Sequence, residues 1–265
     1  MNKIAVMLAG GKGTRLYPIS TEKRPKQFLN LLSEQTMLED SIDRIKPIFS
    51  PESIFINTID KYKGFIEKLP YRAIIEPRGA GTTISVFVIV LELIKKYGDC
   101  VITLLPSDHY IENEKLYRKT IDIAIDIVIN TNDIVLIGIE PTDYEVGYGY
   151  INHRNGKIID FKEKPNEEMA KKYVENGYLW NSGIFVFKAS LMYSLYEKLQ
   201  NDLFKQVMFT YSKGILHYFY ENVKFEPTSF EKSIIEMTDR LRVVKGNFGW
   251  CDIGDLRRYR KLIRG

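Results

Sequence analysis

The sequence predicts an α/β protein of the Rossmann-like type, in which helices flank a mainly parallel mixed sheet and an inserted lobe extends the second half. Two observations predict this fold. In the first half of the chain, short runs rich in Ile and Val alternate with longer amphipathic stretches, which is typical of parallel strands joined by helical crossovers. A glycine-rich segment directly follows the first apolar run, at the position where open α/β sheets bind ligands.

The apolar runs of the first half predict buried strands, because strands covered on both faces are apolar nearly throughout. The stretches between them predict helices, and Thr36 with Glu39 has the spacing of a capping box at the start of the first helix. The expected strands cover 4–9, 53–57, 72–76, 101–105 and 134–139, and the expected helices cover 36–46, 60–68, 82–96 and 114–130.

The pattern changes after residue 140. Arg154-Asn155-Gly156 contains the Asn-Gly pair typical of a tight hairpin turn, so we expect antiparallel strands on either side of it. The chain shows no internal repeat, low-complexity tract or Pro/Gly-rich linker, which favours a single domain over residues 1–265. The remaining expected elements are strands at 148–153, 157–162, 179–187 and 241–245, and helices at 166–175, over most of 189–220, and at 256–263.

Composition and charge indicate a globular protein and argue against several other classes of protein. The 265 residues are 45% hydrophobic and 27% charged, which is ordinary for a soluble globular protein. The net charge of +4 is small, and its Lys and Arg residues are scattered. This distribution suits phosphate ligands and argues against a dedicated nucleic-acid surface. The two cysteines, Cys100 and Cys251, match neither a disulfide scaffold nor a metal-ligand spacing.

The hydropathy pattern indicates neither export nor a membrane. The N-terminal apolar run is too short for a signal peptide, and the longest apolar run, 84–91, is well below a membrane span. We therefore expect a cytoplasmic protein with no nucleic-acid or membrane partner. The sequence leaves open whether the protein forms a homodimer.

The first predicted strand runs into Gly10-Gly11-Lys12-Gly13-Thr14-Arg15-Leu16. Glycines after a parallel strand let backbone N–H groups approach a phosphate, and Lys12 and Arg15 add cationic donors. The loop does not fit the dinucleotide fingerprint, whose third glycine would fall on Leu16. It does not fit a Walker A loop either, because Lys12 is followed by Gly13.

The same loop, preceded by Leu8-Ala9 and followed by Lys23-Arg24-Pro25-Lys26-Gln27-Phe28, closely resembles the signature of the sugar nucleotidyltransferase (nucleotide-sugar pyrophosphorylase) family. The Pro-Lys-Gln-Phe ending is similar to the mannose-1-phosphate guanylyltransferase branch. Further blocks resemble the family, in family order over nearly the whole chain: Glu76-Pro77, Leu105-Pro106-Ser107-Asp108-His109, Gly147-Tyr148-Gly149-Tyr150, Phe161-Lys162-Glu163-Lys164-Pro165, Trp180-Asn181-Ser182-Gly183-Ile184-Phe185 and Phe248-Gly249-Trp250-Cys251-Asp252-Ile253-Gly254.

The resemblance implies transfer of a guanylyl group from GTP to mannose 1-phosphate, with Mg²⁺ as cofactor and GDP-mannose and pyrophosphate as products. A sugar phosphate is already an anionic nucleophile, so such a reaction needs positioning, cations and metal rather than a general base. The resemblance also divides the domain into a nucleotide-binding half (1–140), a sugar-binding lobe (141–225) and a C-terminal segment (226–265). We expect no β-helix or isomerase extension of the kind that longer relatives carry.

Residue roles follow from the matching motifs. Arg15 and Lys12 are expected to clamp the triphosphate, Lys26 to hold phosphates near the reacting centre, and Lys164 to contact the sugar phosphate. Without the resemblance, such cations would be interpreted as solvated surface charges. The full expected set is catalytic Arg15, Lys26 and Lys164; nucleotide-binding Leu8, Gly10, Gly11, Lys12, Gly13, Thr14 and Glu76; sugar-binding Gly149, Glu163 and Asn181; and metal-binding Asp108 and Asp252.

Four residues have individual expectations. Glu76 is placed to read the N1–H and amino group of guanine. His109 is expected to be structural, because a phosphate nucleophile needs no base. Trp180 and Trp250 are expected to be packing walls.

The match departs from the family in one functional segment. Ala80 and Gly81 stand where the family usually has arginine and asparagine. The resemblance therefore does not determine how the base or the ribose is recognised. Glu231 stands where the family commonly has aspartate.

The alternatives are a nucleotidyltransferase for another sugar 1-phosphate (manno-heptose, glucose) or another nucleoside triphosphate, a non-catalytic nucleotide-sugar-binding regulatory subunit, and, at the level of the fold, an NAD-dependent oxidoreductase.

Overall fold

The central sheet of the computed structural model contains β1 (Asn2–Leu8), β2 (Ile54–Ile59), β3 (Arg72–Glu76), β4 (Cys100–Pro106), β6 (Ile134–Ile139), β7 (Gly149–Arg154), β8 (Lys157–Glu163), β9 (Leu179–Lys188) and β10 (Leu241–Lys245). Their order across this nine-stranded sheet is β3-β2-β1-β4-β9-β6-β10-β8-β7. A second, two-stranded sheet pairs β5 (His109–Ile111) with β11 (Trp250–Asp252). The structure describes residues 1–13, 16–214, 216–222, 228–254 and 258–260.

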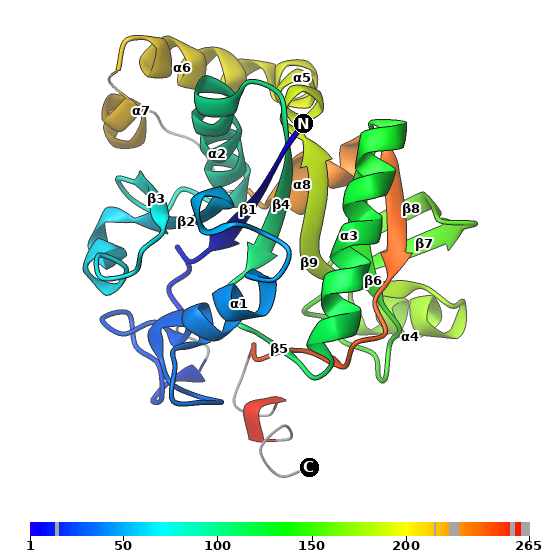
Figure 1. The fold of residues 1–265 in the computed structure, drawn as a ribbon. Helices are drawn as coiled ribbons and strands as arrows, with labels where there is room; N and C mark the ends of the chain where they lie inside the picture. Colours follow the sequence, from blue (N-terminus) through cyan, green and yellow to red (C-terminus); the bar gives the residue numbers. More distant parts are fainter. Residues whose placement is uncertain (14–15, 215, 223–227, 255–257, 261–265) are drawn as a thin grey trace.

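Helices cover both faces of the sheet (Figure 1). The residues of β1 alternate between two cores because successive side chains of a strand point to opposite faces. Ile4 and Val6 pack in one core with α2, while Ala5 and Met7 pack in the other with α1 and α3. The helices are α1 (Met37–Ile45), α2 (Thr82–Tyr97), α3 (Glu114–Thr131), α4 (Glu167–Glu175), α5 (Ala189–Leu199), α6 (Asn201–Ser212), α7 (Leu216–Asn222) and α8 (Phe230–Ser233), with 3-10 turns η2 (Lys26–Phe28), η3 (Pro51–Ser53), η4 (Asp60–Phe65) and η5 (Ile235–Met237).

The sheet is mixed, as the sequence predicts. β1 is parallel to β2 and β4, β2 is parallel to β3, and β6 is parallel to β10. β9 runs antiparallel between β4 and β6, in the middle of the sheet. Segment 141–225 therefore contributes β7, β8 and β9 to the same sheet as the first half of the chain. The carboxyl ends of β1, β2, β3 and β4 lie at one edge, where the loops of the candidate site begin.

Two local predictions are confirmed by the backbone. Thr36 and Glu39 form a complete capping box at the start of α1. The hairpin between β7 and β8 turns at Asn155 and Gly156, which both have positive φ, the requirement of the tight turn that Asn-Gly predicts.

One helix prediction needs correction. Residues 60–68 do not form an α-helix, because Asp60–Phe65 form the 3-10 turn η4 and the following residues form a turn. Gly64 weakens helix formation there, and the ring of Phe65 stacks on Phe28 at 4.5 Å between centroids, so packing sets the local shape. The prediction of helices over most of 189–220 is confirmed by α5, α6 and α7. Of the predicted closing helix 256–263, residues 258–260 are helical and the others lie outside the described residues.

Within the described residues, no helix combines the length and the apolarity that crossing a membrane requires.

Candidate active site

The glycine-rich loop after β1 is held by side chains that bind its carbonyl oxygens. Gln27 Nε2 donates to the carbonyls of Ala9 at 3.0 Å and Gly11 at 2.8 Å. Thr58 Oγ1 donates to the carbonyl of Ala9 at 3.0 Å. Carbonyls fixed in this way cannot turn toward an anion, which suits a loop whose N–H groups are to bind phosphate.

The loop also packs closely against the segment that begins η2. Gly13 has φ +62°, and a Cβ there would lie 2.6 Å from the backbone nitrogen of Lys26, so the position requires glycine. Lys12 is exposed, with its Nζ 3.9 Å from Glu22 Oε1. Thr14 and Arg15, which the sequence places in the nucleotide-binding and catalytic sets, lie outside the described residues.

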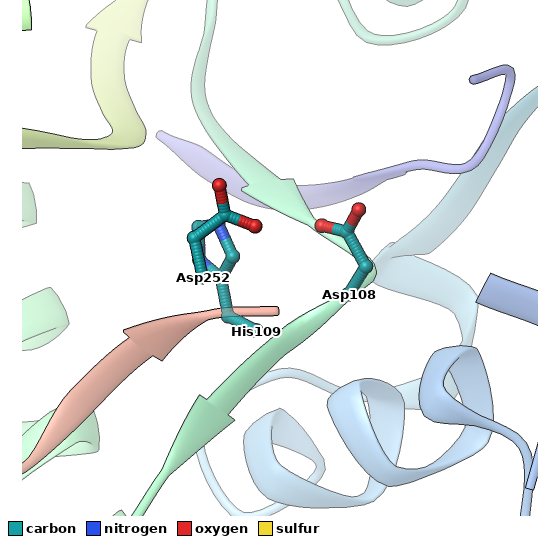
Figure 2. A group of neighbouring side chains, drawn as sticks. All are labelled: Asp108, His109 and Asp252. Carbon is teal, nitrogen blue, oxygen red and sulfur yellow. The ribbon is translucent and has the colours of Figure 1, made fainter. Parts of the chain in front are cut away.

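The two predicted metal carboxylates are brought together by the pairing of β5 with β11. In this antiparallel ladder Asp252 lies opposite His109, and Trp250 lies opposite Ile111. Asp108 immediately precedes β5. One ligand atom from each of Asp108, His109 and Asp252 lies within 4.8 Å of the others, and the side chains converge at the ends of the two strands (Figure 2).

Lys26 lies between the two carboxylates. Its Nζ is 2.7 Å from Asp108 Oδ2 and 3.4 Å from Asp252 Oδ1, and it donates to the carbonyl of Ile253 at 2.9 Å. The Lys26 side chain is 7% exposed, against 24% for Asp108 and 17% for Asp252. A buried ammonium with three oxygen partners is held in a fixed position, which a group acting on transferred phosphates requires.

The chemistry of this donor set fits Mg²⁺. The ion prefers a few carboxylates together with phosphate oxygens and water, rather than a cage of protein ligands. Asp108 and Asp252 offer two carboxylates that are partly open to solvent. These two residues would hold the ion.

His109 is buried and lies next to the two carboxylates. Trp250 Nε1 donates to His109 Nδ1 at 3.1 Å, and the two rings meet edge to face. Burial lowers the pKa of His109, although the neighbouring carboxylates of Asp108 and Asp252 oppose this shift. Trp250 packs against its neighbours, as the sequence predicts. Its indole N–H also donates a hydrogen bond to His109, which a residue that only packs would not do.

The predicted sugar-binding residues line one pocket of about 120 Å³ beside the carboxylates. Gly149 lies opposite Glu163 in the β7–β8 ladder, and a Cβ on Gly149 would lie 2.9 Å from Glu163 Oε2. Lys164, at φ +47°, places its Nζ 2.7 Å from Glu163 Oε1. Asn181 on β9 is 7% exposed. The pocket also includes Asp252, so the predicted sugar and metal residues meet at one site.

A second carboxylate, Glu231 on α8, shares this pocket with Glu163 and Lys164. Burial raises the pKa of Glu231, and the carboxylate of Glu163 adds to the increase. Carboxylates accept hydrogen bonds from hydroxyl groups, and a nearby lysine offsets their repulsion. The pocket is therefore suited to a ligand that has both hydroxyl groups and an anionic group.

Glu76 lies apart from this pocket, at the end of the edge strand β3. It is 2% exposed, and its carboxylate accepts hydrogen bonds from Tyr220 Oη at 2.6 Å and from Asn57 Nδ2 at 3.0 Å. Burial raises the pKa of Glu76, and these two donors oppose the increase. Both carboxylate oxygens thus already have protein partners.

Two residues that the sequence analysis did not assign contribute to the site. Gln27 holds the glycine-rich loop, and its place in the Lys26-Gln27-Phe28 motif was the available signal. Arg258 lies 2.8 Å from Glu145 and 3.5 Å from Asp252 Oδ2, with its guanidinium 4.3 Å from the centroid of the Tyr148 ring. No local pattern marks Arg258, because its partners are far away in the sequence.

Together the fold and the site indicate an α/β enzyme, with a glycine-rich loop after β1, a carboxylate pair and a polar pocket. The Nucleotidyl transferase family model matches residues 4–264. The chain therefore belongs to the nucleotidyl transferase family.

Individual relatives agree with this family. The chain is 30% identical over 276 residues to the alginate biosynthesis protein AlgA of Pseudomonas fluorescens, covering 95% of this chain and 56% of the relative. It is also 30% identical over 276 residues to the mannose-1-phosphate guanylyltransferase of Salmonella muenchen, covering 95% and 57%. The chain thus spans a little more than half the length of these curated relatives.

A solved structure, described as mannose-1-phosphate geranyltransferase from Thermus thermophilus, matches with a TM-score of 0.92 and 29% identity. The match covers 100% of this chain and 80% of that chain.

Proposed function

We propose that the chain transfers a guanylyl group from GTP to mannose 1-phosphate, giving GDP-mannose and pyrophosphate. The observation that carries the proposal is the convergence of Asp108 and Asp252, from distant parts of the chain, beside the pocket that contains Glu163 and Lys164. A site that only bound a nucleotide sugar would not need both carboxylates. The names of the relatives from Salmonella and Thermus support mannose 1-phosphate as the acceptor.

In this reaction an oxygen of the sugar phosphate attacks the α-phosphorus of the triphosphate, and the bond to the bridging oxygen of pyrophosphate breaks. Mg²⁺ bound by Asp108 and Asp252 would neutralise phosphate charge. Lys26 holds phosphate oxygens near the reacting phosphorus, and Lys164 holds the sugar phosphate while Glu163 accepts bonds from sugar hydroxyls. The backbone of Leu8, Gly10, Gly11 and Gly13, with Lys12, Thr14 and Arg15, binds the nucleotide phosphates. All of these groups act by position and charge.

A second candidate uses another nucleotide. Because Tyr220 and Asn57 already donate to Glu76, that carboxylate is engaged without a guanine base. This engagement reduces the part that Glu76 can play in selecting guanine, so another triphosphate, such as dTTP or UTP, is the runner-up.

A substrate panel tests the proposal. Pyrophosphate release is measured with each of four nucleoside triphosphates against mannose, glucose and manno-heptose 1-phosphates. We expect GTP with mannose 1-phosphate to give the highest kcat/KM. A pyrimidine triphosphate that outperforms GTP would contradict the guanylyl assignment and leave the family assignment intact.

Gly149→Ala tests the sugar side of the pocket. The new methyl group would lie 2.7 Å from Phe161 Cζ and 2.9 Å from Glu163 Oε2, so Glu163 has to move. We expect a higher KM for the sugar 1-phosphate with little change in KM for the nucleotide, and a free energy of unfolding lower by about 1–3 kcal/mol from overpacking.

The control for that variant is Gly64→Ala, because a Cβ at Gly64 meets nothing within 4 Å. Steady-state kinetics and denaturant unfolding measure both variants. An unchanged KM for the sugar phosphate in Gly149→Ala would show that Glu163 does not bind the sugar.

A further inference from the structure

The three potential metal ligands of the site form a set that is not specific for Mg²⁺. An imidazole nitrogen together with two carboxylate oxygens, all within 4.8 Å of one another, is a donor set that also suits Zn²⁺ and other transition ions. Such ions bind sites with nitrogen and oxygen ligands more tightly than Mg²⁺ does. Whether His109 offers a lone pair to the ion therefore decides which cation this centre prefers.

The contact from Trp250 determines what His109 can offer. An indole N–H can only donate a hydrogen bond, so the bond at 3.1 Å requires a lone pair on His109 Nδ1. An imidazolium, with hydrogens on both nitrogens, could not accept this bond. The ring is therefore neutral with its hydrogen on Nε2, and neither nitrogen has a lone pair left for a metal ion.

The backbone fixes this contact firmly. Trp250 and Asp252 lie on β11, opposite Ile111 and His109 of β5, so the same two-stranded ladder positions the donor, the imidazole and one carboxylate. The indole also packs edge to face with His109 and against Tyr148, at 5.3 Å and 5.2 Å between ring centroids.

We propose that Trp250 is a specificity-determining residue of the metal centre, because its indole N–H keeps His109 from binding the ion and so favours Mg²⁺, bound by oxygen, over Zn²⁺. The inference rests on the proposed function, which assigns the ion to Asp108 and Asp252. It adds that the identity of the ion is set by a residue that does not touch it.

The variant Trp250→Phe removes the N–H and keeps an aromatic ring in the ladder. Binding of Zn²⁺ and of Mg²⁺ is measured separately by isothermal titration calorimetry on the whole chain. We expect the affinity for Zn²⁺ to rise about ten- to a hundredfold, the size of effect that residues hydrogen-bonded to metal ligands have, while the affinity for Mg²⁺ changes less than about threefold. A folded Trp250→Phe protein with an unchanged ratio of the two affinities would overturn the proposal.

Two controls isolate the N–H. Trp180→Phe changes the other indole of the same aromatic cluster, whose Nε1 is buried with no hydrogen-bond partner, and should leave the ratio of affinities unchanged. The double variant Trp250→Phe, His109→Ala should lose the gain in affinity for Zn²⁺. If the double variant keeps the gain, the zinc is bound elsewhere, with Cys251 as the nearest thiol, and the proposal is wrong.

A measurement on the unaltered protein covers the case in which Trp250→Phe does not fold. The chain has three histidines, so ¹⁵N spectra of the imidazole groups, assigned with His109→Ala, report which nitrogen of His109 carries the hydrogen. Hydrogen on Nε2 alone supports the proposal, and hydrogen on Nδ1 overturns it. Failure of the unaltered protein to bind Mg²⁺ would instead refute the metal centre of the proposed function, whatever the ¹⁵N spectra show.

Discussion

Asp108→Asn and Asp252→Asn are each expected to reduce turnover about a thousandfold or more and to leave the fold intact. The loss corresponds to about 4 kcal/mol of transition-state stabilisation. Each substitution removes an anionic oxygen from the pair that would hold Mg²⁺, and an amide is nearly the same size as the carboxylate it replaces. The side chains are only partly buried, at 24% and 17% exposed, so no large packing defect follows.

The matched control is Asp160→Asn, because Asp160 pairs with Lys162 on the exposed side of β8, and such surface pairs contribute little. Turnover is measured by pyrophosphate release over a range of Mg²⁺ concentrations, and the fold by circular dichroism. Near-normal turnover of either metal-site variant at saturating Mg²⁺ would show that the metal assignment is wrong.

Lys26→Ala is expected to lower kcat about a hundred- to a thousandfold, with a smaller change in KM for the sugar 1-phosphate. Losing one preorganised donor at a developing charge costs about 3–4 kcal/mol in other enzymes. The residue is 5% exposed and its ammonium is held by two carboxylates and a carbonyl, so it is preorganised. Its removal also leaves Asp108 and Asp252 with less compensation for their mutual repulsion. Added Mg²⁺ should therefore raise the melting temperature of the variant more than that of the unaltered protein.

Lys162→Ala is the control for this substitution, since Lys162 makes an exposed pair with Asp160. Single-turnover kinetics with a fixed, saturating nucleotide concentration separate chemistry from binding. If Lys26→Ala changes only KM, Lys26 binds the ground state and the transition state equally and does not lower the barrier of the chemical step.

The sequence predicts those parts of the structure whose signals are local. The strands of the first half are confirmed because each contains a short apolar run, and the turn at Asn155-Gly156 is confirmed because few residues adopt its backbone conformation. The capping box of α1 is likewise a contact between residues three positions apart.

Contacts between distant residues were not predictable in the same way. β5 and β11 have three residues each, too few to show a period, and they pair across more than a hundred residues. Glu76 was predicted from its strand alone, whereas its partner Tyr220 lies on α7. The hydrogen bond between Trp250 and His109 is another contact between distant residues. Neither residue is marked as polar by its local sequence, and the two become a hydrogen-bonded pair only in the fold.

The pairing of β11 with β5 also separates the carboxylate pair from the main sheet. The nine strands of the main sheet are complete once β10 ends at Lys245, but Asp252 and its ladder come later in the chain. Every ladder of the nine-stranded sheet thus lies outside Trp250–Asp252. Substitutions in β11 can therefore disturb the carboxylate pair while the main sheet keeps all of its ladders.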